Sequence, residues 1–415
     1  MNEQVLYWIW LSTRPRLGAK GLRGLLESFG QPDALFAADV AALERAGVAP
    51  TLCKALLDKN LGPARSILQA CEQLGITVLT LASEAYPAAM RQTADAPAVL
   101  YCRGSLPGSG MQPWIGLVGA RQADERGLAL AWRFGAEIAA CGGVVVTGMA
   151  KGVDAAAARG ALEQSCPVVG VLGGGVDVVY PRENAALFQQ VAAHGCLLSE
   201  YPPGTTPNAR HFPARNRIIS ALSDGIAVIQ AAESSGALIT ARWATEQGRD
   251  VFSVPGPAGD ALSRGCNQLL RDGAILAESG LDVMREYLYR YPGAVKLQGS
   301  RIMDQGSGAC SGAHRCATEQ ASPQGAERKD TAVGAHSVRQ PAAASLAPAA
   351  RPLPTDLTPE QTAIVAALQD GPMQLDALID KTGLPAARVL SQLTLLQIKK
   401  ILRQLPGKLY ERSGG

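Results

Sequence analysis

Between Ile115 and Ala274 the chain repeats one unit, in which a short apolar run is followed by a glycine-containing turn and then by an amphipathic stretch. The apolar runs are rich in Val and Ile and contain almost no polar residue. They are Ile115–Gly119, Val144–Gly148, Val168–Leu172, Cys196–Ser199, Ile226–Gln230 and Val251–Val254. Unbroken runs of this kind are typical of strands buried on both faces of a parallel sheet, whereas half-exposed strands alternate. We therefore predict an α/β fold with a Rossmann-like, doubly wound parallel sheet of about six strands.

Glycine-containing turns follow the first three apolar runs. In doubly wound sheets ligands bind beyond the carboxyl ends of the strands, so these turns are candidate binding loops. Gly119 is followed by Arg121, and Lys151 lies between Gly148 and Gly152. Glycine lets a ligand approach the backbone, arginine offers a two-pronged contact to phosphate, and a helix start favours an anion. Tight connections would explain the glycines of one turn, but the repetition with two basic residues favours an anion site.

The third turn carries three consecutive glycines, Gly173, Gly174 and Gly175, which we expect to leave the backbone open to a bulky polyanion. Neither a GxxxxGK[ST] phosphate loop nor a strict GxGxxG dinucleotide motif occurs in the chain. Asp154, which follows the second turn, is expected to cap the next helix. The turns therefore predict an anion site that lacks both standard nucleotide motifs.

A basic and aromatic segment follows the fourth apolar run. It contains Phe212, Arg215, Asn216 and Arg217, a combination that suits phosphate contact together with base stacking. The alternative is that Asn216 and Arg217 begin a helix and hydrogen-bond neighbouring loops. The sequence leaves both interpretations open, and each can hold for a different arginine.

Small hydroxyl-bearing residues follow the fifth apolar run. The hydroxyl-bearing residues are Ser235 and Thr240, and Gly236 follows Ser235. All three come directly before or at the start of an expected helix. Such residues donate hydrogen bonds to a phosphate or cap the helix internally. We include them among the candidate binding residues.

The composition limits the partners and the compartment. A net charge of +3 over 415 residues is small, so nucleic-acid affinity would have to come from local clustering. Nine cysteines without a CxxC pair favour reduced thiols and hence a cytoplasmic protein. The apolar run Val5–Leu11 is too short to span a membrane and lacks a basic leader. We expect no secretory signal and no membrane partner.

Two parts are expected in residues 1–292. One is a helical module before the sheet, and the other is the core that contains the sheet. Residues 1–75 have apolar residues at helical spacing in short pieces broken by Gly and Pro, a pattern typical of small helical modules of the SAM or helix-hairpin-helix kind. This helical pattern favours a role in packing or protein interaction over contact with DNA. Residues 76–292 are expected to form the Rossmann-like core with its lead-in, which includes a strand at Ile76–Leu81 and a proline-broken connection.

Two further parts are expected after the core. Residues 293–354 have the composition of a disordered linker, and their Cys310, His314 and Cys316 make a poor zinc site. Residues 355–415 follow the helix, helix-turn-helix, hairpin order of a winged helix. Their seven basic residues nearly balance six acidic ones. This balance favours protein contact or weak regulation over a firm grip on DNA, and it disfavours a transcription factor.

The core resembles the DNA-processing protein A family, also called DprA or Smf. Nine blocks occur in the family's order across the core. They are Val118–Arg121, Thr147–Asp154, Gly160–Leu162, Val171–Pro181, Ser199–Pro202, Phe212–Ile219, Ser235–Ala241, Val254–Gly256 and Gly265–Ala274. The flanking helical module and the winged helix also match the family's common layout, although less specifically.

The resemblance implies a protein without catalytic activity that binds single-stranded DNA, protects it during natural transformation and loads the RecA recombinase onto it. It also implies a homodimer formed through the Rossmann-like domain. Arg121 and Lys151 match the basic residues of the family's DNA pocket, and the glycine turns and the Arg215–Arg217 segment lie around the same pocket. We expect no cofactor, no metal site and no catalytic residues.

Two positions depart from the family's pattern, because Ala158 replaces a usual histidine and Gln230 replaces a usual acidic residue. Neither change removes a basic residue, so DNA binding is not put in doubt. The alternative is a nucleotide-processing hydrolase of a related Rossmann-like fold. Such an enzyme needs a carboxylate acid or base or a positioned nucleophile, and no pair of carboxylates near the predicted site has a defining motif around it.

Overall fold

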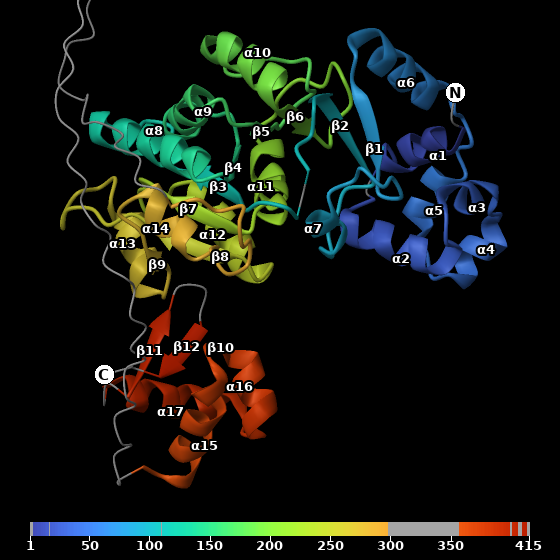
Figure 1. Ribbon diagram of the computed structural model, residues 1–415. Helices are drawn as coiled ribbons and strands as arrows, with labels where there is room; N and C mark the ends of the chain where they lie inside the picture. Colours follow the sequence, from blue (N-terminus) through green and yellow to red (C-terminus); the bar gives the residue numbers. More distant parts are fainter. Residues whose placement is uncertain are drawn as a thin grey trace, which may run out of the picture. The chain divides into compact units, whose positions relative to one another are not determined.

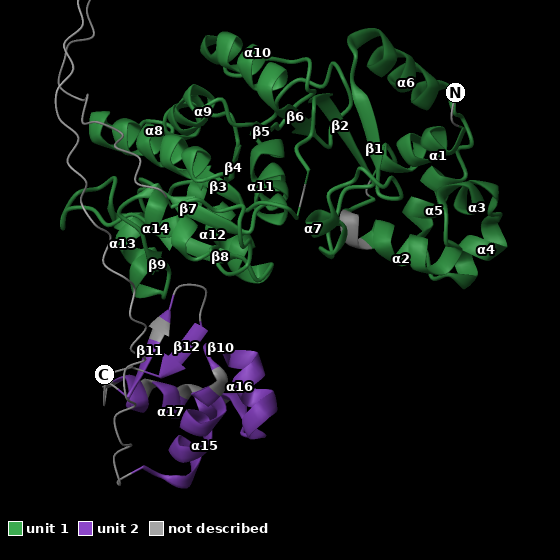
Figure 2. Ribbon diagram, in the orientation of Figure 1, with its two compact units in different colours: residues 1–302 green, residues 303–415 purple. Residues whose placement is uncertain are grey.

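The structure, a computed structural model, describes residues 3–15, 17–108, 110–297, 357–398, 401–405 and 409–412 (Figure 1). The chain divides into two compact units, residues 1–302 and 303–415 (Figure 2). Within the described ranges no helix has both the length and the apolar character needed to cross a bilayer. The cysteines at the seven described positions are free thiols.

The first unit contains a nine-stranded sheet in the order β1-β2-β6-β5-β4-β3-β7-β8-β9. The seven strands from β6 to β9 in this order are parallel, and β1 and β2 pair antiparallel. The strands are β1 (Thr77–Thr80), β2 (Val99–Gly104), β3 (Trp114–Val118), β4 (Val144–Thr147), β5 (Val168–Val171), β6 (Cys196–Ser199), β7 (Gly225–Val228), β8 (Asp250–Ser253) and β9 (Ile275–Leu276). From β3 the chain winds outward in both directions, so the sheet is doubly wound, as predicted.

The six predicted core strands and the strand near residues 77–80 are confirmed, but the sheet is larger than predicted and is not wholly parallel. β2 lies within the segment expected to be a proline-broken connection. Its prolines flank it, and Tyr101 of β2 pairs with Ser199 of β6. β9 has only two residues, too few to form a recognisable apolar run.

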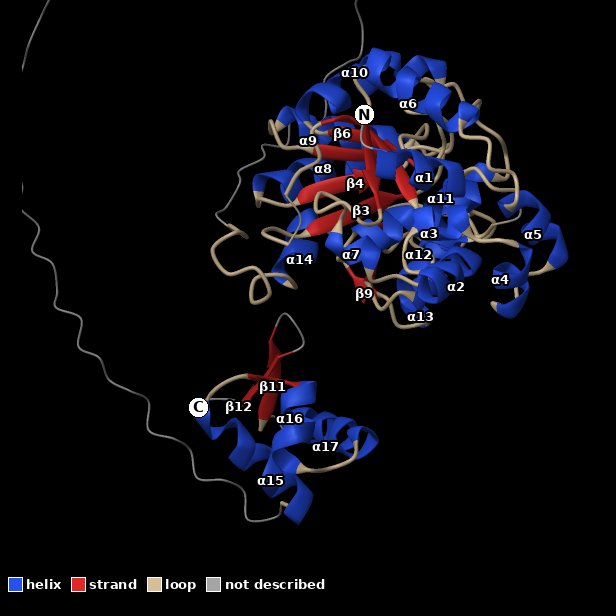
Figure 3. Cartoon of the chain, turned by 90° about the vertical axis from the view of Figure 1, so that its right-hand side faces the viewer, coloured by secondary structure: helices blue, strands red, loops and turns tan. Residues whose placement is uncertain are grey.

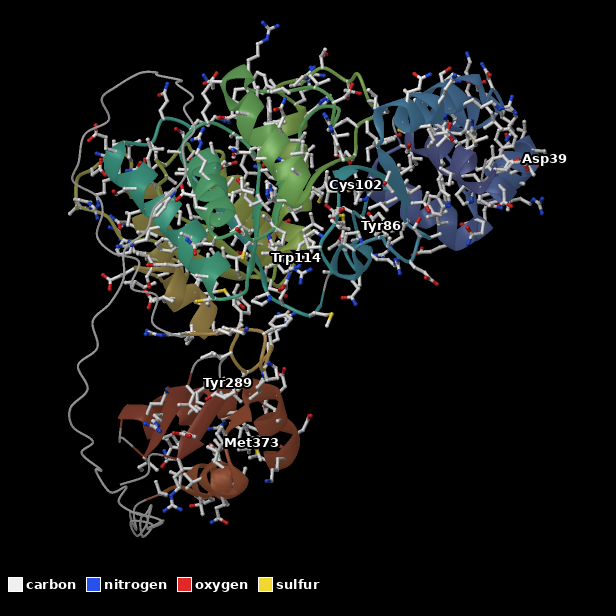
Figure 4. All side chains as sticks on the ribbon, turned by 45° about the horizontal axis from the view of Figure 1, so that its top comes forward. Asp39, Tyr86, Cys102, Trp114, Tyr289 and Met373 are labelled. Atoms are coloured by element: carbon white, nitrogen blue, oxygen red, sulfur yellow. The ribbon has the colours of Figure 1, made fainter. Side chains whose placement is uncertain are left out.

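Helices cover both faces of the sheet, which explains the unbroken apolar runs (Figure 3). Ile115 and Leu117 of β3 belong to the hydrophobic cluster that also contains Phe134 of helix α8. Trp114 and Val118 belong to the opposite cluster, together with Tyr86 and Cys102 (Figure 4). Consecutive side chains of one strand therefore enter different cores, and both must be apolar.

The helices of the first unit lie before, between and after the strands in the sequence. They are α1 (Glu3–Ser12), α2 (Ala19–Phe29), α3 (Pro32–Ala37), α4 (Val40–Arg45), α5 (Pro50–Leu56), α6 (Gly62–Leu74), α7 (Ala88–Arg91), α8 (Glu125–Ala140), α9 (Val153–Glu163), the 3-10 helix η1 (Arg182–Asn184), α10 (Ala185–His194), α11 (His211–Leu222), α12 (Ala237–Glu246), α13 (Arg264–Arg271) and α14 (Gly280–Arg285). The six helices from α1 to α6 form the expected helical module. Their core, which includes Trp10 and Leu35, is continuous with that of the sheet.

The first residues of the expected linker, 293–297, pack on the core. Val295 is buried, and the N–H of Lys296 donates to the carbonyl oxygen of Cys141 at 3.0 Å. The chain therefore stays packed on the core through residues 293–297, because an apolar side chain and a backbone hydrogen bond hold it there. The candidate metal ligands Cys310, His314 and Cys316 lie outside the described residues.

The second unit has the predicted winged-helix order. Its helices are α15 (Pro359–Ala367), the 3-10 helix η2 (Leu368–Asp370), α16 (Leu375–Thr382) and α17 (Ala386–Ile398), and its strands are β10 (Met373–Gln374), β11 (Leu402–Leu405) and β12 (Leu409–Arg412). The sheet order is β10-β12-β11. Thr358 and Gln361 form a capping box at the start of α15, and Ile364, Leu378 and Leu393 contribute to a separate core.

Helices α8 and α9 approach so closely that two glycines are required between them. A Cβ atom at Gly160 would overlap the carbonyl oxygen of Trp132, and one at Gly135 would overlap the carbonyl oxygen of Ala157. Backbone oxygen cannot move aside as a flexible side chain can. The contact therefore fixes the position of α9, whose first turn approaches the site described below.

We predict that Gly160→Ala destabilises the protein by about 1–3 kcal/mol, because the added methyl group forces the two helices apart. Gly24→Ala is the matched control, since Gly24 is exposed in α2 and a Cβ atom there meets nothing within 4 Å. The control should gain about 0.5–1 kcal/mol from helix propensity. The check is the thermal unfolding midpoint of the full chain. Equal midpoints for Gly160→Ala and wild type would show that the contact does not constrain α9.

Candidate nucleic-acid interface

A cavity of about 800 Å³ opens beyond the carboxyl ends of β3 and β7. The turn after β3, the first turns of α11 and the loop that leads into α12 supply most of its lining. β3 is the strand from which the sheet winds both ways, so the cavity lies at the position where doubly wound folds bind ligands. The topology alone therefore makes it the leading candidate site.

Eight of the fifteen predicted site residues line this cavity. They are Gly119, Arg121, Phe212, Arg215, Asn216, Ser235, Gly236 and Thr240. They come from three separate segments of the sequence and meet because β3 and β7 end, and α11 begins, at one edge of the sheet. The other seven are placed elsewhere. They are Gly148, Lys151, Gly152, Gly173, Gly174, Gly175 and Arg217, none of which is among the lining residues.

The triple-glycine turn is closed, contrary to the sequence-based expectation. Gly173, Gly174 and Gly175 are all buried. A Cβ atom at Gly174 would lie 2.9 Å from the carbonyl oxygen of Thr205, and the N–H of Gly175 donates to that same oxygen at 2.9 Å. The loop after β6 therefore covers the turn, and the glycines serve that close approach.

The two glycines around Lys151 also serve packing. Gly152 has a φ of 74°, which a side chain rarely adopts, and a Cβ atom there would lie 2.7 Å from the carbonyl oxygen of Arg121. The second turn thus packs its backbone directly against the first. Lys151 itself forms an ion pair with Glu183, and both side chains are more than half exposed.

Arg217 is paired with two carboxylates, an arrangement that the alternative interpretation allowed. Its guanidinium pairs with Glu200 and lies 3.7 Å from the carboxylate of Asp95. Both partners are distant in sequence, which is why a local pattern cannot reveal them. The helix begins at His211 rather than at Asn216, so Arg215 and Arg217 point in different directions from its second turn.

Arg215 is buried at the base of the cavity. Its guanidinium donates to the carbonyl oxygen of Gly148 at 2.6 Å and also to that of Val171, and its Nε donates to Asn216 at 3.3 Å. Burial lowers the pKa of Arg215 to about 10, and the negative charge of Asp154 opposes this shift. A single side chain thus joins the ends of β4 and β5 to α11.

Asp154 does not cap α9, contrary to expectation, because Gly152 occupies the cap position. Its carboxylate is buried and accepts from the N–H of Ala150 at 3.4 Å. Burial raises the pKa of Asp154, whereas the neighbouring charge of Arg215 lowers it. Its role is therefore to balance the buried guanidinium.

Aromatic rings and an exposed cation meet at the rim. The guanidinium carbon of Arg121 lies 5.0 Å from the ring centroid of Phe212, and the rings of Tyr180 and Phe212 are 5.7 Å apart. Arg121 is exposed and Tyr180 is 50% exposed. Tyr180 is an additional lining residue, beyond those predicted from the sequence, and it directly precedes Pro181 after the third glycine turn. The rim can contact a phosphate and the face of a base at the same time.

Two protein-family models match this chain, one over the core of the first unit and one over the winged helix. The family model for DNA recombination-mediator protein A matches residues 77–288, and the model for the DprA winged helix domain matches residues 347–408. Protein Smf from Synechocystis is 33% identical over 99% of this chain and 99% of its own length. The chain belongs to the DNA recombination-mediator protein A family.

Other members of the DprA family show the same core. DNA processing protein DprA from Bacillus subtilis is 40% identical over 53% of this chain and 74% of its own length. The solved structure of DprA from Streptococcus pneumoniae has a TM-score of 0.59 and 31% identity, and the match covers 67% of this chain and 96% of that one. The match includes most of the first unit's length.

Among the residues that the structure describes, no group of three or more His, Cys, Asp or Glu side chains could hold a metal ion. Asp154 is the one acidic residue in the described lining of the cavity. The site thus offers hydrogen-bond donors, one exposed guanidinium and aromatic surface.

We predict that Arg215→Met and Asp154→Asn each destabilise the protein by about 3–5 kcal/mol, because each leaves the other charge buried and uncompensated. The double variant should lose less than the sum of the two, since no charge remains unbalanced. Urea denaturation of the four proteins measures this coupling. Strictly additive losses would show that the two charges do not depend on one another.

Proposed function

We propose that this member of the DprA family binds single-stranded DNA at the cavity beyond β3 and β7 and that it is not an enzyme. The observation that carries the proposal is the exposed guanidinium of Arg121 beside the rings of Phe212 and Tyr180. A single strand presents phosphates and unpaired base faces side by side, whereas a duplex hides the faces. The family's description as a recombination mediator supports a DNA ligand.

The contacts proposed here tolerate any sequence. Arg121 binds a phosphate, and a base stacks on Phe212 or Tyr180, since every base has a π face. Ser235 and Thr240 supply hydroxyl donors, and the backbone at Gly119 and Gly236 can approach the strand closely. Affinity should fall as salt rises, because bound counterions are released from the DNA.

Lys151 remains a second phosphate contact in this proposal. Its ion pair with Glu183 is exposed, and an exposed pair contributes only about 0–1 kcal/mol. A DNA phosphate can therefore compete for the ammonium group. The strand would leave the cavity rim and pass over the second turn.

Family membership supports a wider role. We propose that the chain protects incoming single strands during natural transformation, loads the RecA recombinase onto them, and acts in the cytoplasm as a homodimer through the Rossmann-like domain. Two pockets on one strand would gain avidity, because the second contact becomes intramolecular.

The alternative, a nucleotide-processing hydrolase, would need a carboxylate that can exchange protons with a substrate. Asp154 is a poor candidate, since it is buried among Ala150, Gly148 and Arg215. A nucleotide hydrolysis assay on the purified chain separates the two functions. Product formation by the folded wild-type chain would favour the enzyme.

We predict that Arg121→Ala weakens binding of a labelled oligo-dT strand at least tenfold, by loss of a charge-assisted phosphate contact. Fluorescence anisotropy at several salt concentrations measures it. The slope of log affinity against log salt should fall by about 0.7 for each phosphate contact removed. Arg103→Ala is the matched control, because Arg103 is an exposed arginine at the end of β2. Unchanged binding by Arg121→Ala would move the site away from the cavity.

We also predict that Glu183→Gln tightens single-strand binding up to about fivefold, because it frees Lys151 from a competing carboxylate. The same titration measures the change. The gain should disappear in the Lys151→Ala background. A gain that persists there would mean that Glu183 acts through general repulsion of DNA instead.

A further inference from the structure

One buried residue makes three hydrogen bonds to the turn that carries Arg121. Gln230 lies just after β7, and 7% of it is exposed. Its carbonyl oxygen accepts from the N–H of Ala120 at 2.7 Å, and its side-chain oxygen accepts from the N–H of Asp124 at 3.2 Å. Its side-chain nitrogen donates to the carboxylate of Asp124 at 3.0 Å. Gln230 therefore holds the turn at both ends, before and after Arg121.

The far end of the turn depends on Asp124, which has two roles. Its Oδ1 atom accepts both from Gln230 and from the N–H of Gly127 at 2.7 Å, and so caps α8. The hydrogen bonds from Gly127 and Gln230 lower the pKa of Asp124. A Cβ atom at Gly127 would lie 2.8 Å from the side-chain carbonyl carbon of Gln230. The glycine leaves room for the amide.

Ala120, at the start of the turn, makes a second backbone hydrogen bond in addition to the one with Gln230. The carbonyl oxygen of Ala120 accepts from the N–H of Val153 at 3.2 Å, at the start of α9. Gln230 therefore holds the backbone on both sides of Arg121, and Val153 of α9 also holds it on the near side, although the Arg121 side chain itself is exposed.

An amide suits position 230 better than the alternatives. It must donate to a carboxylate and accept from an N–H at the same time. A carboxylate at this position would face the carboxylate of Asp124, and an aliphatic side chain would remove both side-chain hydrogen bonds to Asp124. The other titratable groups in the recess around Gln230 are Arg126, Asp260 and Cys266. Asp260 is already engaged, because it accepts from the hydroxyl of Ser263 and the N–H of Leu262.

We infer that Gln230 is a positioning residue for DNA binding, which holds the Arg121 turn in the shape that presents the guanidinium to a phosphate. This inference rests on the proposed function. Gln230 is not among the residues that line the cavity, so we expect any effect of its loss on DNA binding to pass through the turn.

The test is the affinity of Gln230→Glu for labelled oligo-dT at pH 8 and at pH 5.5, at one ionic strength. At pH 8 the new carboxylate repels Asp124, and binding should weaken on the order of tenfold. At pH 5.5 the variant should recover, because repulsion raises the pKa of the glutamate and a protonated carboxyl can donate as the amide does. Wild-type binding at the two pH values is the reference for the ratio.

Three further variants sharpen the result. Asp124→Asn added to Gln230→Glu should restore binding at pH 8, since the asparagine amide can donate to the glutamate. Gln230→Met should weaken binding equally at both pH values. Gln189→Glu, the same change of charge at an exposed position of α10, should leave both affinities at the wild-type value.

The cycle with Arg121→Ala distinguishes positioning from general destabilisation. In the Arg121→Ala background, Gln230→Glu should have no further effect on affinity at pH 8. An equal loss in both backgrounds would overturn the inference, as would wild-type affinity of Gln230→Glu or of Gln230→Met at pH 8. If Arg121→Ala itself binds like wild type, it is the proposed function that fails. Thermal melts at both pH values confirm that each variant is folded.

Discussion

The buried guanidinium of Arg215 is the constraint on which the site depends. It binds carbonyl oxygens at the ends of β4 and β5 and is balanced by Asp154 from α9. An arginine this deep is costly to desolvate, so every neighbour must be in place before it is stable. Because Arg215 lies in the second turn of α11, fixing it also fixes Phe212 and Asn216 at the cavity.

The cavity combines this buried base with a rim that carries an exposed positive charge. At the base of the cavity, the guanidinium of Arg215 donates its hydrogen bonds to backbone oxygens. Arg215 therefore fixes the shape of the cavity. Above, the exposed guanidinium of Arg121 lies over the ring of Phe212 and is placed where a solvated phosphate can reach it. A buried cation with fixed partners and an exposed cation on a turn with a fixed backbone differ in what they can contact, although both arginines line one cavity.

The sequence predicted the sheet well, because burial on both faces leaves an unmistakable apolar run. It missed β2, whose run is hidden among prolines, and β9, which is too short to show a pattern. It also identified the turns that approach the cavity. It could not tell which basic residues are already paired, since Lys151 meets Glu183 and Arg217 meets Glu200 and Asp95 only in three dimensions. For the same reason the closed state of the Gly173–Gly175 turn was not foreseeable.

The most direct test of the central claim is photo-cross-linking of a 5-iododeoxyuridine-substituted single strand to the full chain, followed by peptide mass spectrometry. The iodinated base cross-links to aromatic side chains that stack on it. A site at the cavity predicts that the cross-linked peptides contain Phe212 or Tyr180. Cross-links confined to the helical module before residue 75, or to the winged helix after residue 357, would contradict it.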